Sequence, residues 1–468
     1  MSESLVPNVL APSNTDFVPP RPRSLEDTGV SSNLLRDLVL KTLYLSTSLA
    51  GFEIASKLRL DYGCIDPLIT KLKEDGHIET GGQAARTPKA FEGGVAALVY
   101  TITDKGREAA KIAMDNNQYI GFAPVSLQQY NISVVKQGLP EQFATPDKLR
   151  HALKELVLPE NTFRTLGPAL NSRSSIFIYG NPGTGKSTIA RNCRQLLGDG
   201  GIYVPYAIAV DDYIIKLFDS SYHEPMGAAS PAADQRWLRT KRPFVQIGGE
   251  LDLEMLDLVF HEHYKYYEAG LQMKANCGIL LIDDFGRQDI SPRKLLNRFI
   301  IPLEEGIDYL NMSEAGRKIE VPFGMLVFFS TNMRPSELVD EAFLRRIRYK
   351  IKIENPTKEE FKEIFIREAD KLKLTRADEA ADYVIKKYYE HRDLTTKEQK
   401  TQLDKEGNPR EERAMRGVHP RDIILHVVEL CSFEGKPVEL TPKVLDYACE
   451  AYFLEHLSED LSNHSPTI

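Results

Sequence analysis

One glycine-rich octapeptide between an apolar strand and a helix constrains the fold of this chain more than any other feature. The strand is predicted over residues 176–179, and the helix is predicted to begin near Lys186. The octapeptide and the residue after it are Gly180, Asn181, Pro182, Gly183, Thr184, Gly185, Lys186, Ser187 and Thr188. Its glycines allow backbone N–H groups to curl around phosphates, and the helix N-terminus adds favourable partial charge. We predict a phosphate loop in which Lys186 contacts the β- and γ-phosphates and the Ser187 hydroxyl binds Mg²⁺.

A second apolar strand, predicted over residues 278–282, ends in two carboxylates, Asp283 and Asp284. Ligands bind at the carboxyl edge of such sheets, so both side chains are expected near the phosphate loop. We expect Asp283 to bind Mg²⁺ and Asp284 to orient or polarise an attacking water. The alternative is a turn that ends the strand with two solvated acids.

Short apolar strands alternate with helices through the middle of the chain. The predicted strands cover residues 176–179, 202–210, 278–282, 325–330 and 349–353. This alternation predicts an α/β domain over residues 145–356, with a parallel sheet covered by helices on both faces. Beyond it, helices predicted over 357–372, 377–390, 421–433 and 442–457 indicate a helical lid over residues 357–458. Residues 391–413 are expected to form a mobile loop and residues 459–468 a tail.

The first third of the chain predicts a smaller domain. Residues 1–30 are expected to be a disordered tail, and residues 120–144 a linker. Between them, over residues 31–119, helices predicted at 34–44, 52–58 and 65–72 precede strands at 77–80 and 97–102. A further helix is predicted after its N-cap, Thr103. This order predicts a winged-helix-like domain.

Composition narrows the possible environments and partners. The chain has 468 residues, a formal net charge of −8 and 42% hydrophobic residues. It lacks an apolar run near the roughly 18 residues that cross a membrane, which predicts a soluble protein without a membrane partner. Residues 1–30 lack the pattern of a signal peptide, so we expect a cytoplasmic location. Residues 31–120 hold eleven Lys and Arg against eleven Asp and Glu, a net charge of zero. Since DNA binding normally needs a basic face, we predict protein contacts for this domain, with DNA possible but not favoured.

The phosphate loop, the acidic strand end, a strand that ends at Asn332 and the helical lid together resemble the AAA+ ATPase superfamily over about residues 145–458. The resemblance implies an ATP hydrolase that uses ATP and Mg²⁺ and forms a homo-oligomeric ring, expected to be a hexamer, with shared active sites. It implies a γ-phosphate sensor at Asn332, an arginine finger at Arg346 or, second, Arg345, and a lid arginine at Arg421. Most members have Asp-Glu where this chain has Asp283 and Asp284, so slow hydrolysis is a possible outcome.

Shorter motifs resemble a bacterial AAA+ group that carries an N-terminal winged-helix-like domain and is loosely described as ATPases with chaperone activity. These motifs are residues 166–168, 274–276 and 284–288. Three uses stay open, namely a remodeller or assembly chaperone of proteins, a DNA-associated ATPase, and a nucleotide-dependent scaffold with little turnover. Tyr264, Tyr266 and Tyr267 are expected to pack against the next strand, with a substrate-gripping pore element as the alternative.

Overall fold

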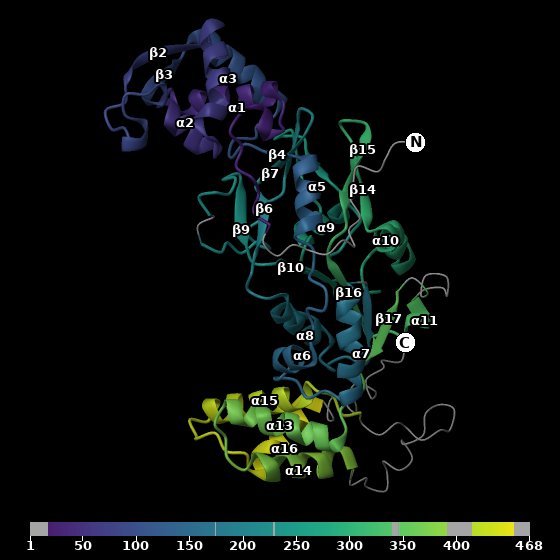
Figure 1. Ribbon diagram of the computed structural model, residues 1–468. Helices are drawn as coiled ribbons and strands as arrows, with labels where there is room; N and C mark the ends of the chain where they lie inside the picture. The colour runs from purple at the N-terminus through teal and green to yellow at the C-terminus, as the bar shows by residue number, and fades with distance from the viewer. Residues whose placement is uncertain are drawn as a thin grey trace, which may run out of the picture.

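The computed structural model describes residues 17–173, 175–227, 230–338, 345, 347–390 and 414–453. Figure 1 shows an elongated molecule with an N-terminal domain at one end and a helical lid at the other. A β-rich body and a parallel sheet with its helices lie between these two ends.

The parallel sheet carries the phosphate loop. Its five strands lie in the order β10, β13, β16, β5 and β17, and every neighbouring pair is parallel. Their bounds are β5 (Ile176–Tyr179), β10 (Phe244–Ile247), β13 (Ile279–Ile282), β16 (Leu326–Thr331) and β17 (Tyr349–Lys352). Four of these strands were predicted, whereas β10 was missed and residues 202–210 lie elsewhere.

Helices cover both faces of the parallel sheet, as predicted. Alternate strand residues such as Ile178 and Phe328 pack against α6 (Pro146–Ala152), α7 (Glu160–Asn171) and α8 (Lys186–Asn192) on one face. The residues between them, such as Phe177 and Phe329, pack on α9 (Leu271–Ala275) and α10 (Pro292–Glu305) on the other. Burial on both faces explains why the central strands are continuously apolar. Two short helical segments, η4 (Cys193–Leu197) and α11 (Pro335–Leu338), follow α8 and β16.

A β-rich body interrupts the α/β domain, and the sequence did not predict it. The segment expected as one strand over residues 202–210 breaks at Tyr206 into β6 (Ile202–Pro205) and β7 (Ala207–Val210). These two strands belong to different sheets, because β6 pairs with β9 (Trp237–Thr240) while β7 pairs with β4 (Val125–Ser126) and β8 (Tyr213–Lys216). The hairpins β11 (Val259–His261) with β12 (Tyr266–Glu268) and β14 (Ile307–Met312) with β15 (Arg317–Pro322) complete the body, alongside the turn η5 (Glu254–Leu256).

Much of the expected linker at residues 120–144 is instead part of this body. It forms β4 and the helix α5 (Leu127–Lys136), whose Tyr130 and Val134 are buried in the same core as Trp237. A capping box between Ser126 and Gln129 starts α5. The prediction was wrong because this amphipathic helix is short and lies among polar residues.

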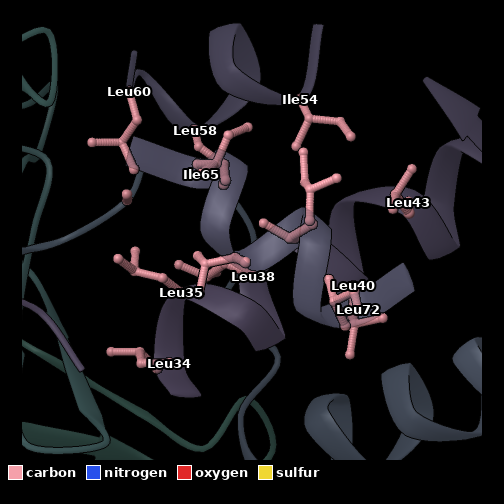
Figure 2. Packing of buried hydrophobic residues seen from close by; sticks show 14 of the residues in the cluster. Leu34, Leu35, Leu38, Leu40, Leu43, Ile54, Leu58, Leu60, Ile65 and Leu72 are labelled. Atoms are coloured by element: carbon pink, nitrogen blue, oxygen red, sulfur yellow. The ribbon is translucent and has the colours of Figure 1, made fainter. Parts of the chain in front are cut away.

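The N-terminal domain packs four helices against a small antiparallel sheet. Its elements are α1 (Ser32–Ser46), β1 (Ser48–Ala50), α2 (Gly51–Leu58), α3 (Tyr62–Glu74), β2 (Ile78–Gln83), β3 (Leu98–Ile102) and α4 (Asp104–Asn116). The strand order is β1, β3, β2, and the loop between β2 and β3 carries the turns η2 (Lys89–Phe91) and η3 (Val95–Ala97). Figure 2 shows leucines of α1 packing against Ile54, Leu58, Ile65 and Leu72 in the core of this domain. Thr103 caps α4 as predicted, by accepting a hydrogen bond from the backbone N of Gly106.

Residues 17–30, expected to be part of a disordered tail, are ordered and pack against the β-rich body. Pro20 bridges to Ala233, and the turn η1 (Glu26–Thr28) leads into α1. Arg236 is fully buried, pairs with Asp234, and donates hydrogen bonds to the carbonyls of Thr28 and Pro124. A buried guanidinium is costly unless paired, so these contacts fix the segment in place. Residues 1–16 lie outside the described residues.

The hairpin of β11 and β12 also joins the body to the N-terminal domain. At its tip, the carbonyl of Tyr264 accepts a hydrogen bond of 2.8 Å from the backbone N of Gln118, and Lys265 donates to the carbonyl of Asp115. Tyr266 packs edge to face on Tyr119, and Tyr267 is fully buried in the body. These contacts favour packing over a pore element, although Tyr264 itself is 48% exposed.

The lid is helical, as predicted, and has a core of its own. It contains α13 (Lys358–Lys371), α14 (Ala377–Ile385), a π-helical turn η6 (Lys386–Glu390), α15 (His419–Phe433) and α16 (Pro442–Phe453). A capping box between Thr357 and Glu360 begins α13. The loop and tail expected at residues 391–413 and 459–468 lie outside the described residues. In the described part of the chain, the helices are too short or too polar to span a membrane.

Candidate nucleotide-binding site

The phosphate loop follows β5 and turns tightly before α8. Gly183 has a φ of 78°, in the left-handed region that favours glycine, and a Cβ there would lie 2.5 Å from Cγ1 of Val418. A Cβ at Gly180 would lie 2.3 Å from the carbonyl oxygen of Ile353 at the end of β17. The two glycines therefore allow the loop to lie against both a neighbouring strand and the lid.

Lys186, the first residue of α8, folds back over the loop. Its Nζ atom donates hydrogen bonds to the carbonyls of Gly180 (3.0 Å) and Asn181 (2.8 Å) and to Oδ1 of Asn332 (2.7 Å). Burial lowers the pKa of Lys186, while the nearby charges of Asp284 and Asp283 act in the opposite direction. The Lys186 amine is thus held, buried, within the loop that the sequence predicts to bind phosphates.

Ser187 and Asp283 meet at the expected metal position. The Ser187 hydroxyl donates to Oδ1 of Asp283 at 2.8 Å, and Nε2 of Gln246 donates to Oδ2 at 3.1 Å. Arg191 in turn donates to the side-chain oxygen of Gln246. One hydroxyl beside one carboxylate suits Mg²⁺, which prefers oxygen ligands and keeps waters and phosphates in its remaining positions. The described residues contain no cluster of three or more His, Cys, Asp or Glu side chains that could hold a metal.

Asp284 lies on the opposite side of the same turn, next to Asn332. Nδ2 of Asn332 donates to Oδ1 of Asp284 at 3.1 Å, so one amide contacts both Lys186 and Asp284. Asp284 has a φ of 48°, and this left-handed turn is held by Gln288. The Gln288 side chain accepts from the backbone N of Gly286 and donates to the carbonyls of Gly248 and Asp283.

Sequence reasoning did not assign roles to Gln246 or Gln288. Gln246 lies on β10, a four-residue strand that the apolar pattern failed to reveal, because Gln246 itself interrupts its three apolar residues. Gln288 lies within the short motif at residues 284–288, whose resemblance gave no role for its side chain. A glutamine carries no distinctive sequence signal, so its contacts become visible only in the folded chain.

The lid approaches the loop just before α15. The backbone N of Val418 donates to the carbonyl of Gly183 at 3.0 Å. Arg421 lies one turn further along, with its side chain 59% exposed and paired with Asp422 at 2.8 Å. Arg421 therefore pairs with a neighbouring lid residue in this structure and makes no described contact with the phosphate loop.

The two arginines expected as a finger lie between α11 and β17. Arg345 is exposed, and Arg346 lies outside the described residues. Exposure of Arg345 is compatible with contact to a second subunit.

The fold and site together define a class. A phosphate loop after β5, carboxylates after β13 and Asn332 after β16 meet at one edge of a five-stranded parallel sheet with a helical lid. This arrangement is the α/β phosphate-loop fold with a helical lid that the sequence predicted.

Comparison with known proteins gives matches of low identity. The chain is similar to a mutant of Thermotoga maritima RuvB, with 14% identity over 65% of this chain and 73% of that chain and a TM-score of 0.37. A second structure, described as the Thermotoga maritima RuvB Holliday junction branch migration motor, has 15% identity over 62% of this chain and 68% of that chain, with a TM-score of 0.32. Residues 402–451 match a family model described as a domain of unknown function, DUF8689. No curated protein matches.

Proposed function

We propose that this protein is an AAA+ ATPase that couples ATP binding and hydrolysis to the remodelling or assembly of a macromolecular partner, with a protein favoured as that partner. The observation that carries the ATPase proposal is the contact of Asn332 with both Lys186 and Asp284. It joins a phosphate-binding cation to the carboxylate that would orient water.

The proposed division of labour follows from these contacts. Lys186 binds the β- and γ-phosphates, the loop backbone over residues 180–188 surrounds the phosphates, and Ser187 and Asp283 hold Mg²⁺. The bound ion would neutralise charge that develops on the phosphates. Asp284 accepts a hydrogen bond from the attacking water, and Asn332 fixes the direction of the Asp284 carboxylate.

The contact between the lid and the phosphate loop would couple nucleotide binding to movement of the lid. The backbone N of Val418 is hydrogen-bonded to the carbonyl of Gly183. A nucleotide that occupies the loop would therefore contact this edge of the lid or displace it. We propose that Arg421 then leaves Asp422 for the nucleotide, so that the angle of the lid follows the state of the γ-phosphate. We further propose a homo-oligomeric ring, expected to be a hexamer, in which Arg346 or Arg345 reaches the site of a neighbouring subunit.

The N-terminal domain is proposed to be a winged-helix-like adaptor, as in the bacterial AAA+ group that the short motifs resemble. Its helices and strands follow the order expected for that shape. Equal numbers of acidic and basic residues over residues 31–120 support a protein partner over DNA.

The test is nucleotide binding and phosphate release by the full chain and by Lys186→Ala. We expect Lys186→Ala to lose both, because it removes the cation of the phosphate loop, while its thermal unfolding stays close to that of the wild type. Lys148→Ala, an exposed lysine on α6, is the matched control and should behave like the wild type. Unchanged turnover in Lys186→Ala would show that the site is assigned wrongly. ATP binding by the wild type without phosphate release would favour a scaffold.

A further inference from the structure

A groove with a volume of about 870 Å³ lies at the junction of the N-terminal domain, the segment over residues 17–30 and the β-rich body. This volume falls within the roughly 300–1,000 Å³ typical of ligand sites. Lys57 of α2 and Phe91 of the loop between β2 and β3 line one part of the groove. Arg21 and the body residues Asp234 and Gln235 line another.

The floor of the groove is apolar and aromatic. Phe52 and Phe91 stack with ring centroids 5.6 Å apart and an interplanar angle of 9°, and both rings are half-buried. Leu49 and Tyr62 extend the same lining. Partly exposed aromatic surface of this kind favours burial of a large apolar side chain.

The acidic residues of the groove already have partners. Glu53 accepts a hydrogen bond from the backbone N of Ala50, and Asp61 pairs with Arg21. Asp234 is buried and accepts from Arg236 and from the indole N–H of Trp237.

Two cations of the groove, in contrast, have no acidic partner among the residues that the structure describes. Arg59 lies over the ring of Phe122 at 4.7 Å, and the exposed Lys57 makes no described ion pair. An incoming carboxylate would therefore find two available cations beside an apolar floor.

We propose that this groove binds a short acidic peptide segment of a partner protein, with an apolar side chain on Phe52 and Phe91 and a carboxylate at Lys57 and Arg59. A nucleic acid fits less well. The lining holds three basic residues (Arg21, Lys57, Arg59) and three acidic ones (Glu53, Asp61, Asp234), so a chain of phosphates would meet as many carboxylates as cations. A single carboxylate, in contrast, needs only Lys57 and Arg59, the two cations without a described acidic partner.

The position of the groove gives the bound segment contact with two parts of the molecule. Gln235 and Asp234 precede Arg236, which holds the carbonyls of Thr28 and Pro124. A peptide in the groove would thus contact the N-terminal domain and the β-rich body together. This proposal deepens the proposed function by giving the protein partner a chemistry, and its test uses no nucleotide, so a failure of ATP hydrolysis would leave it unaffected.

The experiment selects ligands for the full chain from a displayed library of random eight-residue peptides. The enriched peptides are then synthesised with a fluorescent label, and their affinity is measured by fluorescence polarisation. We expect enrichment of sequences that combine Asp or Glu with a large apolar residue. Lys57→Glu and Phe91→Ala should each weaken their binding by about tenfold or more. Lys111→Glu, an exposed lysine on α4 away from the groove lining, is the matched control and should bind like the wild type.

Several outcomes would overturn the proposal. These are the absence of enriched peptides, enrichment of basic peptides, or unchanged affinity in a Lys57→Glu protein that melts like the wild type. Displacement of the peptide by a twelve-nucleotide oligothymidylate at about 150 mM salt would assign the groove to nucleic acid instead. Binding that occurs only after deletion of residues 1–16 would make this chain's own segment the occupant.

Discussion

The side-chain oxygen of Asn332 accepts a hydrogen bond of 2.7 Å from the amine of Lys186. Through its Nδ2 atom the same amide donates to Asp284 at 3.1 Å. The Lys186 amine donates three hydrogen bonds, so a phosphate that binds it must share or break one of them. Where this is the bond to Asn332, the change reaches Asp284 through the same amide. Phosphate binding and the orientation of the Asp284 carboxylate are therefore linked through one side chain.

Asn332→Ala should lower ATP turnover by about tenfold to a hundredfold while changing ATP affinity much less. The substitution frees Asp284 from its amide partner, but it leaves Lys186 and the phosphate loop in place. Measuring kcat and KM for ATP separates the two effects. Asn311→Ala, an exposed asparagine on β14, is the control. A variant that loses ATP affinity and keeps kcat would contradict the linkage.

Asp284→Asn should keep ATP and Mg²⁺ bound while slowing hydrolysis, because Asp283 still holds the metal when the neighbouring carboxylate is gone. Asp283→Asn should instead weaken Mg²⁺ binding, since the Ser187 hydroxyl loses its carboxylate partner. Mg²⁺-dependent binding of a fluorescent ATP analogue distinguishes the variants. Equal loss of nucleotide affinity in both would mean that the two aspartates are not divided between these tasks.

Arg346→Ala should leave ATP affinity nearly intact and reduce turnover, with a smaller reduction for Arg345→Ala. Mixing Arg346→Ala with Asp284→Asn should restore part of the activity, because some interfaces then combine an intact arginine with an intact aspartate. Turnover of the mixture is compared with that of each variant alone. A wild type that is monomeric by light scattering, with activity independent of protein concentration, would refute shared sites.

Duplex DNA should bind the full chain weakly, and with strong dependence on salt. The N-terminal domain carries no net charge over residues 31–120, whereas several phosphate contacts require a clearly basic face. Fluorescence anisotropy with a labelled duplex over a salt series measures this. Micromolar or tighter affinity at about 150 mM salt would place the DNA-associated ATPase first among the candidate functions.

Acid should weaken the β-rich body through His223. Burial lowers the pKa of His223 from its ordinary value of 6.5 to about 4. Its Nδ1 accepts from the backbone N of Asp219, and its Nε2 bonds to the carbonyl of Lys274. Between about pH 6.5 and 4 the unfolded chain binds a proton that the folded chain excludes, so stability falls as pH falls.

The loss from His223 should reach about 2 to 3 kcal/mol near pH 4.5. The check is the thermal midpoint of the wild type against that of His223→Gln, at about pH 7 and about pH 4.5. His223→Gln should be destabilising at the higher pH and less so at the lower one. A difference between the two proteins that is the same at both pH values would show that His223 does not titrate in this range.

Much of the site could be predicted because its signals are local. The glycines at residues 180–185 and the lysine after them specify the loop within eight positions, and the apolar run before Asp283 specifies a buried strand. The N-caps Thr103 and Thr357 act on backbone N–H groups three residues away, so their effect can also be read along the chain. Nearby residues suffice to decide such features.

The β-rich body and the order of residues 17–30 were decided by tertiary contacts. Arg236 donates hydrogen bonds to the carbonyls of Thr28 and Pro124, which lie 208 and 112 positions away, and no local pattern predicts these partners. The break at Tyr206, which sends β6 and β7 into different sheets, likewise depends on which strands are available to pair. The sequence by itself determined where phosphate-binding and carboxylate groups lie along the chain. Only the folded structure decided which distant segments pack together. Strand pairing, and the hydrogen bonds that offset the cost of burying a charged side chain, depend on partners that the local sequence does not contain.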